Sequence, residues 1–236
     1  MVDDQLRSIY RALAAGSGDE PQGRLEAVCH LCVDVLVVTG AGIMLMADRA
    51  HQGTVYATDE RIRLLEELQN AAAEGPCLDA YNLGRPVFEP DLAGDGRRAW
   101  PVLAPGAVDA GMAALFSFPL QLDDASFGAL NLYREVPGPL TPSQVANARL
   151  FAAVAAREVL AMQAEAVPGS LPASIGDLSG DRSAIEQATG MVAAQTGATV
   201  LEAARRLREA AREQGRPLAV LSREIVTRIV RFPLQP

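Results

Sequence analysis

Few residues in this chain have the types and spacing that enzymes or metal sites use. Only two histidines, His30 and His51, occur among the 236 residues, so a multi-histidine metal site is excluded. The sequence also lacks a Gly-x-Ser-x-Gly turn, a phosphate-binding P-loop and a dinucleotide-binding glycine fingerprint. The sequence therefore predicts neither an enzyme nor a metal site, and it indicates no particular cofactor.

The three cysteines are the next candidates for chemistry. Cys29 and Cys32 form a C-x-x-C pair, which is typical of redox proteins. Both fall on the apolar face of a predicted helix, where cysteine behaves as a small hydrophobic residue. Cys77 instead follows Gly75-Pro76, and a thiol presented there at a helix N-terminus would have a lowered pKa. Two interpretations of Cys77 stay open: a ligand-sensing or reactive thiol, and a cysteine packed beneath a rigid turn.

Arginines follow one face of a predicted helix over residues 199–214. Arg205, Arg208 and Arg212 form a stripe about 120° from an apolar stripe on the same helix. The apolar stripe contains Val200, Ala203, Ala204, Leu207 and Ala211. Such a basic face is either a solvated surface or a contact surface for phosphate.

Charge is divided unevenly along the chain. Residues 179–231 contain nine arginines and six acidic residues, a balance of +3, whereas the whole chain carries −8, which leaves −11 for the remainder. This asymmetry predicts two parts with different roles, the basic part being the candidate for nucleic-acid contact.

The elements that position these residues differ between the two parts. The first part alternates predicted helices with predicted strands at 43–46, 54–58, 114–120 and 127–133. The helices are predicted at 4–15, after Pro21 until the break at Gly40, at 61–73 and at 142–166. Asp123-Asp124 lies between the last two strands and predicts a hairpin turn. We therefore expect an α+β domain with a mainly antiparallel sheet flanked by helices.

The second part shows no strand pattern. Three helices are predicted, over residues 183–196, 199–214 and 218–230, which gives a small all-α three-helix domain. Gly169 to Gly180 contains proline and glycine with few large apolar residues and is the predicted linker. We expect a first domain over residues 1–167, a linker over 168–180 and a second domain over 181–236.

The C-terminal helices resemble the ANTAR domain, a three-helix RNA-binding module. The resemblance rests on Ile185–Met191, Glu202-Ala203 and Leu207-Arg208. Thr189 stands where the family usually has lysine, and Ala204 where an aromatic residue is common. The resemblance implies binding to paired RNA hairpins, and with it regulation of transcription termination or of translation. The candidate RNA-contacting residues are Thr189, Gly190, Arg205, Arg208, Arg212 and Arg216.

The first part resembles the GAF sensor domains that precede ANTAR domains in actinobacterial proteins. The resemblance rests on an ordered run of motifs: Glu74–Ala80, Gly84–Val87, Trp100-Pro101, Phe118–Leu120 and Gly128–Tyr133. It implies a six-stranded or similar antiparallel sheet with a small-ligand pocket on one face. The candidate ligand-sensing residues are Cys77, Phe116, Phe118, Leu130 and Leu132.

Together these features predict a signal-responsive RNA-binding regulator that forms a homodimer. We expect it in the cytoplasm, because the sequence has no signal peptide and no apolar run of the roughly 18–20 residues that span a bilayer. One alternative is a ligand- or redox-sensing dimerisation module whose ANTAR-like tail no longer binds RNA. A second, a methionine sulfoxide reductase using Cys77 and another thiol, is disfavoured by the predicted burial of Cys29 and Cys32.

Overall fold

The computed structural model describes residues 21–47, 50–122, 125–165, 173–214, 216 and 218–228. The chain divides into two compact units, Met1–Ser174 and Ile175–Pro236. The helix expected at residues 4–15 lies outside the described residues. None of the helices in the described ranges has the length and apolarity that a bilayer crossing needs.

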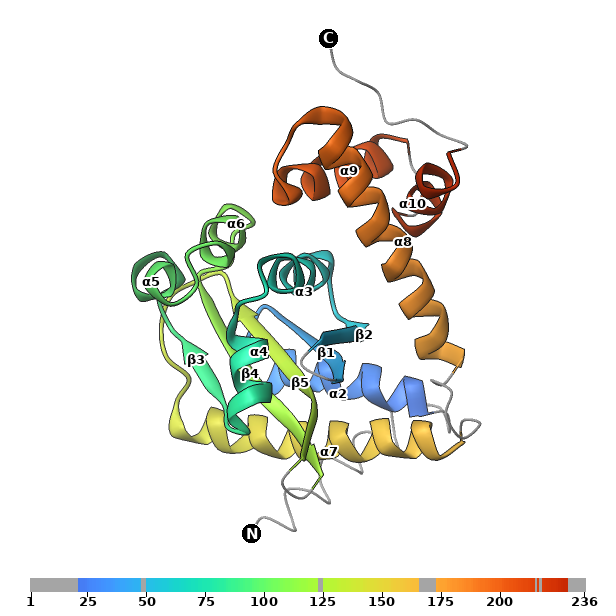
Figure 1. Cartoon of the computed structure of the whole chain (residues 1–236). Coiled ribbons are helices and arrows are strands. Elements are labelled where there is room, and N and C mark those ends of the chain that lie inside the picture. Colours follow the sequence, from blue (N-terminus) through green and yellow to red (C-terminus); the bar gives the residue numbers. More distant parts are fainter. Residues whose placement is uncertain are drawn as a thin grey trace. The chain divides into compact units, whose positions relative to one another are not determined.

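The first unit is built on one antiparallel sheet (Figure 1). Its described residues form five strands in the order β2-β1-β5-β4-β3. The strands are β1 (Gly40–Ala47), β2 (Ala50–Ala57), β3 (Val87–Glu89), β4 (Ala114–Leu122) and β5 (Ala125–Arg134). Strands β4 and β5 pair antiparallel up to Leu122 and Ala125, which confirms the hairpin expected between them, although Asp123 and Asp124 lie outside the described residues.

Helices cover both faces of this sheet. Helices α2 (Pro21–Leu36) and α7 (Pro142–Glu165) pack against each other on one face, and α3 (Glu60–Ala72) and α4 (Pro76–Leu83) lie on the other (Figure 1). Because both faces are covered, every residue of β4 from Ala114 to Leu120 is buried. This explains why six of these seven residues are apolar, with Ser117 as the exception, and why the strand does not alternate with polar residues.

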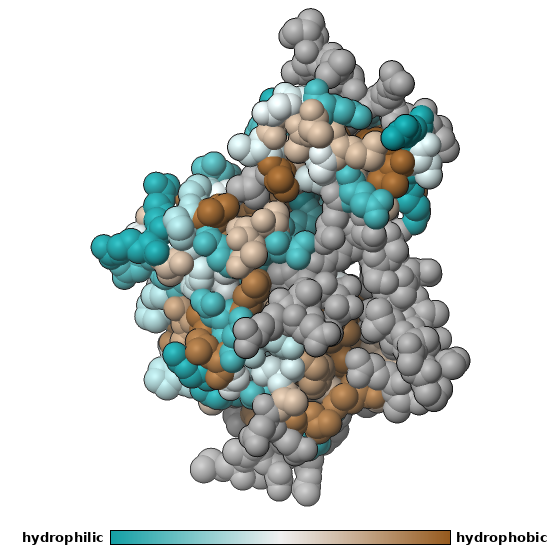
Figure 2. All heavy atoms as spheres, viewed as in Figure 1, coloured by the Kyte–Doolittle hydropathy of each residue, from teal (hydrophilic) through white to brown (hydrophobic). Residues whose placement is uncertain are grey.

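Short helical segments connect β3 to β4. They are a π-helical turn (Leu92–Gly96), α5 (Arg97–Ala99) and α6 (Leu103–Asp109). The surface over α5 is hydrophilic (Figure 2), and both Arg97 and Arg98 are exposed there.

The second unit contains three helices in its described residues, as the sequence predicts. They are α8 (Ala173–Thr196), α9 (Val200–Glu213) and α10 (Leu218–Val226). Gly197, with φ of 67°, adopts the left-handed conformation that ends α8. The Thr199 hydroxyl then accepts a hydrogen bond from the Glu202 amide (3.2 Å) and caps the start of α9.

Helix α8 begins ten residues earlier than the predicted helix and covers residues 173–180 of the predicted linker. Gly176 and Gly180 weaken a helix by roughly 1 kcal/mol each relative to alanine but do not break it. The last proline before α8 is Pro172, so no proline interrupts this helix. The domain boundary at residue 180 stays a prediction.

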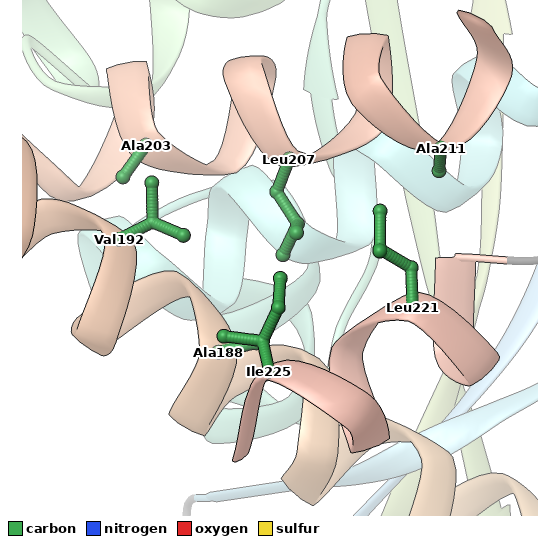
Figure 3. Close-up of a cluster of buried hydrophobic side chains, with 7 residues drawn as sticks. All are labelled: Ala188, Val192, Ala203, Leu207, Ala211, Leu221 and Ile225. Carbon is green, nitrogen blue, oxygen red and sulfur yellow. The ribbon is translucent and has the colours of Figure 1, made fainter. Parts of the chain in front are cut away.

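A small apolar core joins the three helices (Figure 3). It contains Ala188, Val192, Ala203, Leu207, Ala211, Leu221 and Ile225, each no more than 4% exposed. Three members of the predicted apolar stripe of α9 are therefore buried. Val200 is half exposed, at 50%, because it lies in the first turn, where α9 begins.

Candidate RNA-contacting surface and candidate sensor site

Arginines and acidic residues alternate along the exposed face of α9. Arg205 Nη2 lies 2.7 Å from Glu202 Oε1, and Arg205 Nη1 lies 2.6 Å from Glu209 Oε1. Arg206 Nε lies 3.0 Å from the same Glu202 Oε1. Spacings of three and four residues bring these side chains together on one helix face. The arginine stripe is therefore partly neutralised by carboxylates of its own helix.

Glu202 is the centre of this ion-pair network. Hydrogen bonds from Arg205 and then from Arg206 lower the pKa of its carboxyl from 4.5 to about 2. The carboxylate therefore stays charged at any physiological pH. A phosphate approaching Arg205 or Arg206 would have to compete with Glu202.

The remaining candidate arginines differ in their surroundings. Arg216 forms an ion pair with Glu224 of α10, which holds the end of α9 and α10 together. Arg208 is half-buried on α9. The side chain of Arg212 lies outside the described part of the chain.

Thr189 does not lie on a surface that could approach RNA, so that expectation is wrong. Its side chain is only 6% exposed, and its hydroxyl donates to the Ile185 carbonyl at 2.7 Å. Threonine makes this bond to the preceding turn of its own helix because the hydroxyl then avoids being buried without a partner. Gly190, the next residue, is exposed, and a Cβ there would meet no heavy atom within 4 Å.

Arg206 is a surface arginine that the stripe did not include. Its side chain is 37% exposed. The signal was present in the sequence, because Glu202 and Arg206 are four residues apart, the spacing of a helical ion pair.

Cys77 lies at the start of α4, on the sheet face that α3 and α4 cover. Gly75 precedes it with φ of 139°, a conformation that side-chain-bearing residues rarely adopt, and Pro76 opens the helix. The Cys77 amide donates to Gln69 Oε1 at 2.8 Å. This hydrogen bond and the turn therefore fix the position of Cys77 in the first turn of α4.

The Cys77 thiol is fully buried, which contradicts the interpretation of Cys77 as a thiol with a lowered pKa. Burial raises its pKa to about 12, which outweighs a hydrogen bond from Asn131 that lowers it. A helix N-terminus favours the thiolate only when the sulfur is not also removed from water. The geometry agrees with a cysteine packed beneath a rigid turn.

The four apolar candidate residues lie on the opposite face of the sheet from Cys77. Leu130 is in register with Ile43, and Ile43 with Tyr56, whose hydroxyl donates to Glu26 of α2 at 3.1 Å. Leu130 therefore faces α2, whereas Ala129 packs with Cys77. Residues in register or two apart share a face. Phe116, Phe118 and Leu132 thus belong with Leu130, and each is no more than 1% exposed.

The structure does not bring the five candidate ligand-sensing residues into one site. The sequence predicts which residues of a strand share a face of the sheet, but it does not predict which face α4 covers. The apolar residues that pack around Cys77 are Met44, Met46, Ala129, Leu78 and Tyr81.

Buried polar side chains also lie on the Cys77 face of the sheet, and the sequence did not single them out. Ser117 donates to Asn131 Oδ1 at 2.7 Å, and both residues are no more than 1% exposed. Within the described residues, neither Asn131 Nδ2 nor Gln69 Nε2 has an acceptor with normal hydrogen-bond geometry. Buried side-chain amide groups are rarely left without a hydrogen-bond acceptor. This face of the sheet is therefore the candidate sensor site.

Cys29 and Cys32 are both fully buried, as the sequence predicts. Burial raises the pKa of each thiol above its ordinary value. Neither is suited to act as a nucleophile in the folded protein.

Two protein families match the chain. Residues 19–159 match the GAF domain and residues 180–226 match the ANTAR domain. A search of curated proteins found no match.

Solved structures similar to the chain include GAF domains from two phosphoenolpyruvate-protein phosphotransferases. The domain from Coxiella burnetii has a TM-score of 0.54 at 14% identity and covers 70% of this chain and 95% of its own. The domain from Acinetobacter has a TM-score of 0.53 at 14% identity and covers 70% and 96%. At such identity the likeness concerns the fold alone. The first unit has this fold and the family match spans more than half of the sequence, so the chain belongs to the GAF domain family and carries an ANTAR domain at residues 180–226.

Proposed function

We propose that this protein is a signal-responsive regulator whose ANTAR domain binds paired RNA hairpins under the control of its GAF domain. The observation that carries the proposal is the ANTAR match over residues 180–226, on a unit whose middle helix presents arginines opposite its buried face. Binding would act on transcription termination or on translation of the bound message. Such a protein works in the cytoplasm, where it meets transcripts as they are made.

The proposed RNA contact is the exposed face of α9. Its candidate residues are Arg205, Arg206 and Arg208, together with Arg212, Arg216 and the backbone around Gly190. Guanidinium groups suit this role because they bind phosphate through two hydrogen bonds at once. Arg205 is 58% exposed, so a phosphate can reach it without unfolding the helix.

A homodimer fits recognition of two hairpins. Two ANTAR domains held in one dimer would bind neighbouring hairpins with a raised effective concentration and no new contacts.

RNA binding by an Arg205→Ala/Arg208→Ala variant tests the proposal. Loss of two phosphate contacts should make the slope of log affinity against log salt shallower by about 1.4–1.8, at roughly 0.7–0.9 per contact. The matched control is Arg97→Ala/Arg98→Ala, which removes two exposed arginines from α5 of the GAF domain. Equal affinity and salt slope in both variants and the unchanged chain would refute this contact surface.

One alternative is favoured by the arrangement of α9. The ion pairs of Arg205 and Arg216 leave less free positive charge on this unit than the sequence indicates. Thr189, where the family usually has lysine, is nearly buried and supplies no cation. The chain would then be a ligand- or redox-sensing dimerisation module whose ANTAR domain no longer binds RNA. No binding to a dual-hairpin RNA, even at low salt, would support this alternative.

A further inference from the structure

Three sulfur atoms converge in the interior of the GAF domain. Cys77 Sγ lies 3.7 Å from Met44 Sδ and 3.9 Å from Met46 Sδ. We propose that Cys77, Met44 and Met46 form a binding site for one Cu(I) ion. A thioether carries neither a charge nor a ring nitrogen, so the residue spacings typical of metal sites do not point to these methionines.

The two sulfur separations measured from Cys77 fit a three-coordinate ion. Metal–sulfur bonds to thiolate are about 2.3 Å long, so three sulfurs at the corners of a trigonal plane are about 4.0 Å apart. The two separations from Cys77 are within a few tenths of an ångström of this value. Small side-chain rotations are therefore enough to bring Cys77 Sγ to bonding distance of an ion shared with either thioether.

The chemistry of the donors selects a soft monovalent ion. Thiolate and thioether ligands favour Cu(I) over the harder divalent ions. Cys77 is the one donor of the three that ionises, so a bound Cu(I) thiolate is neutral. Glu66, whose carboxylate accepts a hydrogen bond from the Thr54 hydroxyl, lies near enough to raise the pKa of the Cys77 thiol. The preference for Cu(I) therefore rests on the softness of the three sulfur donors.

The surrounding structure holds the three donors in place. Met44 and Met46 are two apart on β1, so both side chains point to the same face. Ala129, opposite Met44 on β5, is small and packs beside the sulfurs. The hydrogen bond from the Cys77 amide to Gln69 Oε1 and the turn at Gly75 fix the backbone that carries the thiol.

Asn131 supplies the supporting hydrogen bond that a metal thiolate needs. Its side chain is fully buried, and Ser117 fixes its Oδ1. Its Nδ2 has no acceptor of normal geometry among the described residues, yet it lies close enough to Cys77 to lower the thiol's pKa. A thiolate on Cys77 would accept this hydrogen bond. Hydrogen bonds of this kind orient metal ligands and stabilise their charged form.

Binding exchanges a proton for the metal ion. The Cys77 S–H bond breaks, a sulfur–copper bond forms, and the proton passes to solvent with no change in oxidation state. Apparent affinity should thus rise about tenfold per pH unit below the pKa of the thiol. This site rests on the proposed function, in which Cu(I) would be the signal that the GAF domain receives. Because metal binding is measured without RNA, a failure of Cu(I) binding can be told from a failure of RNA binding.

Cu(I) titration of the full chain under reducing, oxygen-free conditions tests the site. Cu(I) is supplied as its complex with a coloured chelator of known affinity. A Cys29→Ala/Cys32→Ala variant removes the competing thiols and should still take up one Cu(I) per chain. Adding Cys77→Ala should abolish this uptake. Absence of uptake in the first variant, or unchanged uptake in the second, would overturn the proposal.

The thioethers are tested by a volume-conserving pair of changes. Met44→Leu/Met46→Leu, in the Cys29→Ala/Cys32→Ala background, keeps the packing and removes both thioether sulfurs. Cu(I) affinity should fall about 10-fold or more, as with the loss of groups that support a metal ligand. Thermal unfolding of each variant verifies the fold. Unchanged Cu(I) affinity in the folded variant would overturn the three-sulfur site.

X-ray absorption at the copper edge gives a measurement that needs no change at the site. The Cys29→Ala/Cys32→Ala chain with one Cu(I) should show a shell of sulfur only, at about 2.3 Å. A nitrogen or oxygen shell would contradict the assignment. Equal displacement of Cu(I) by Zn²⁺ would contradict the preference for a monovalent ion.

Discussion

Replacing Glu202 by glutamine should strengthen the dependence of RNA binding on salt. Glu202 contacts two arginines, Arg205 and Arg206, but it does not hold them equally. Arg205 keeps Glu209 as a partner at 2.6 Å after the change. Arg206 has no other acidic partner among the residues that the structure describes. The change therefore frees about one guanidinium group, and not two.

The size of the effect follows from this count. One additional phosphate contact steepens the slope of log affinity against log salt by about 0.7–0.9. A fourfold reduction in salt should then raise the affinity of Glu202→Gln about threefold more than that of the unchanged chain. Filter binding or fluorescence anisotropy with a dual-hairpin RNA at four salt concentrations would measure both slopes.

A matched control separates this local effect from net charge. Glu135→Gln removes one exposed carboxylate that pairs with Arg61 in the GAF domain, so the net charge changes equally. Its salt slope should equal that of the unchanged chain. If Glu202→Gln and Glu135→Gln gave the same slope, the ion pairs on α9 would not limit RNA binding, and the reasoning would fail.

Two further predictions concern stability and pH. Leu207→Ala should destabilise the ANTAR domain by about 2–5 kcal/mol, because Leu207 is fully buried in its small core; thermal unfolding would show this, with the half-exposed Val200→Ala as control. Burial raises the pKa of Cys77 from 9.0 to about 12, so the folded state favours the neutral thiol. This contribution is fully present below pH 9 and is lost as pH rises towards 12, so Cys77→Ala should lose less unfolding free energy between pH 8 and pH 10 than the unchanged chain. An equal loss in denaturant titrations would contradict it.

The parts of the fold with a strong periodic pattern could be predicted from the sequence. Helix α9 is predicted because its apolar residues repeat at the helical interval, and strands β4 and β5 because each is a short, mostly apolar run beside the Asp123-Asp124 turn. Helix α6 was not, because Pro105 and Gly106 lie within it. Proline is tolerated in the first turn of a helix, and Gly106 fits close against Leu68, a contact between distant segments that no local rule contains.

The candidate sites were predicted less completely, for a related reason. The arginine stripe follows from helix geometry alone, whereas the orientation of Thr189 depends on whether its hydroxyl bonds to its own backbone. The separation of Cys77 from Phe116 and Leu130 depends on which face of the sheet α4 covers. Such tertiary facts are not contained in the spacing of residues.

The composition of the ANTAR core would make its stability depend on a bound RNA. Of the seven buried side chains that the structure describes in this core, three are alanine, so these seven remove little apolar surface from water. An RNA that binds only the folded form adds about 2.7 kcal/mol of stability at 100 times its dissociation constant. Under the proposed function, copies without RNA would open more often and be cut more readily by proteases. The amount of this regulator in a cell would then follow the amount of its target RNA, without a separate control of its synthesis.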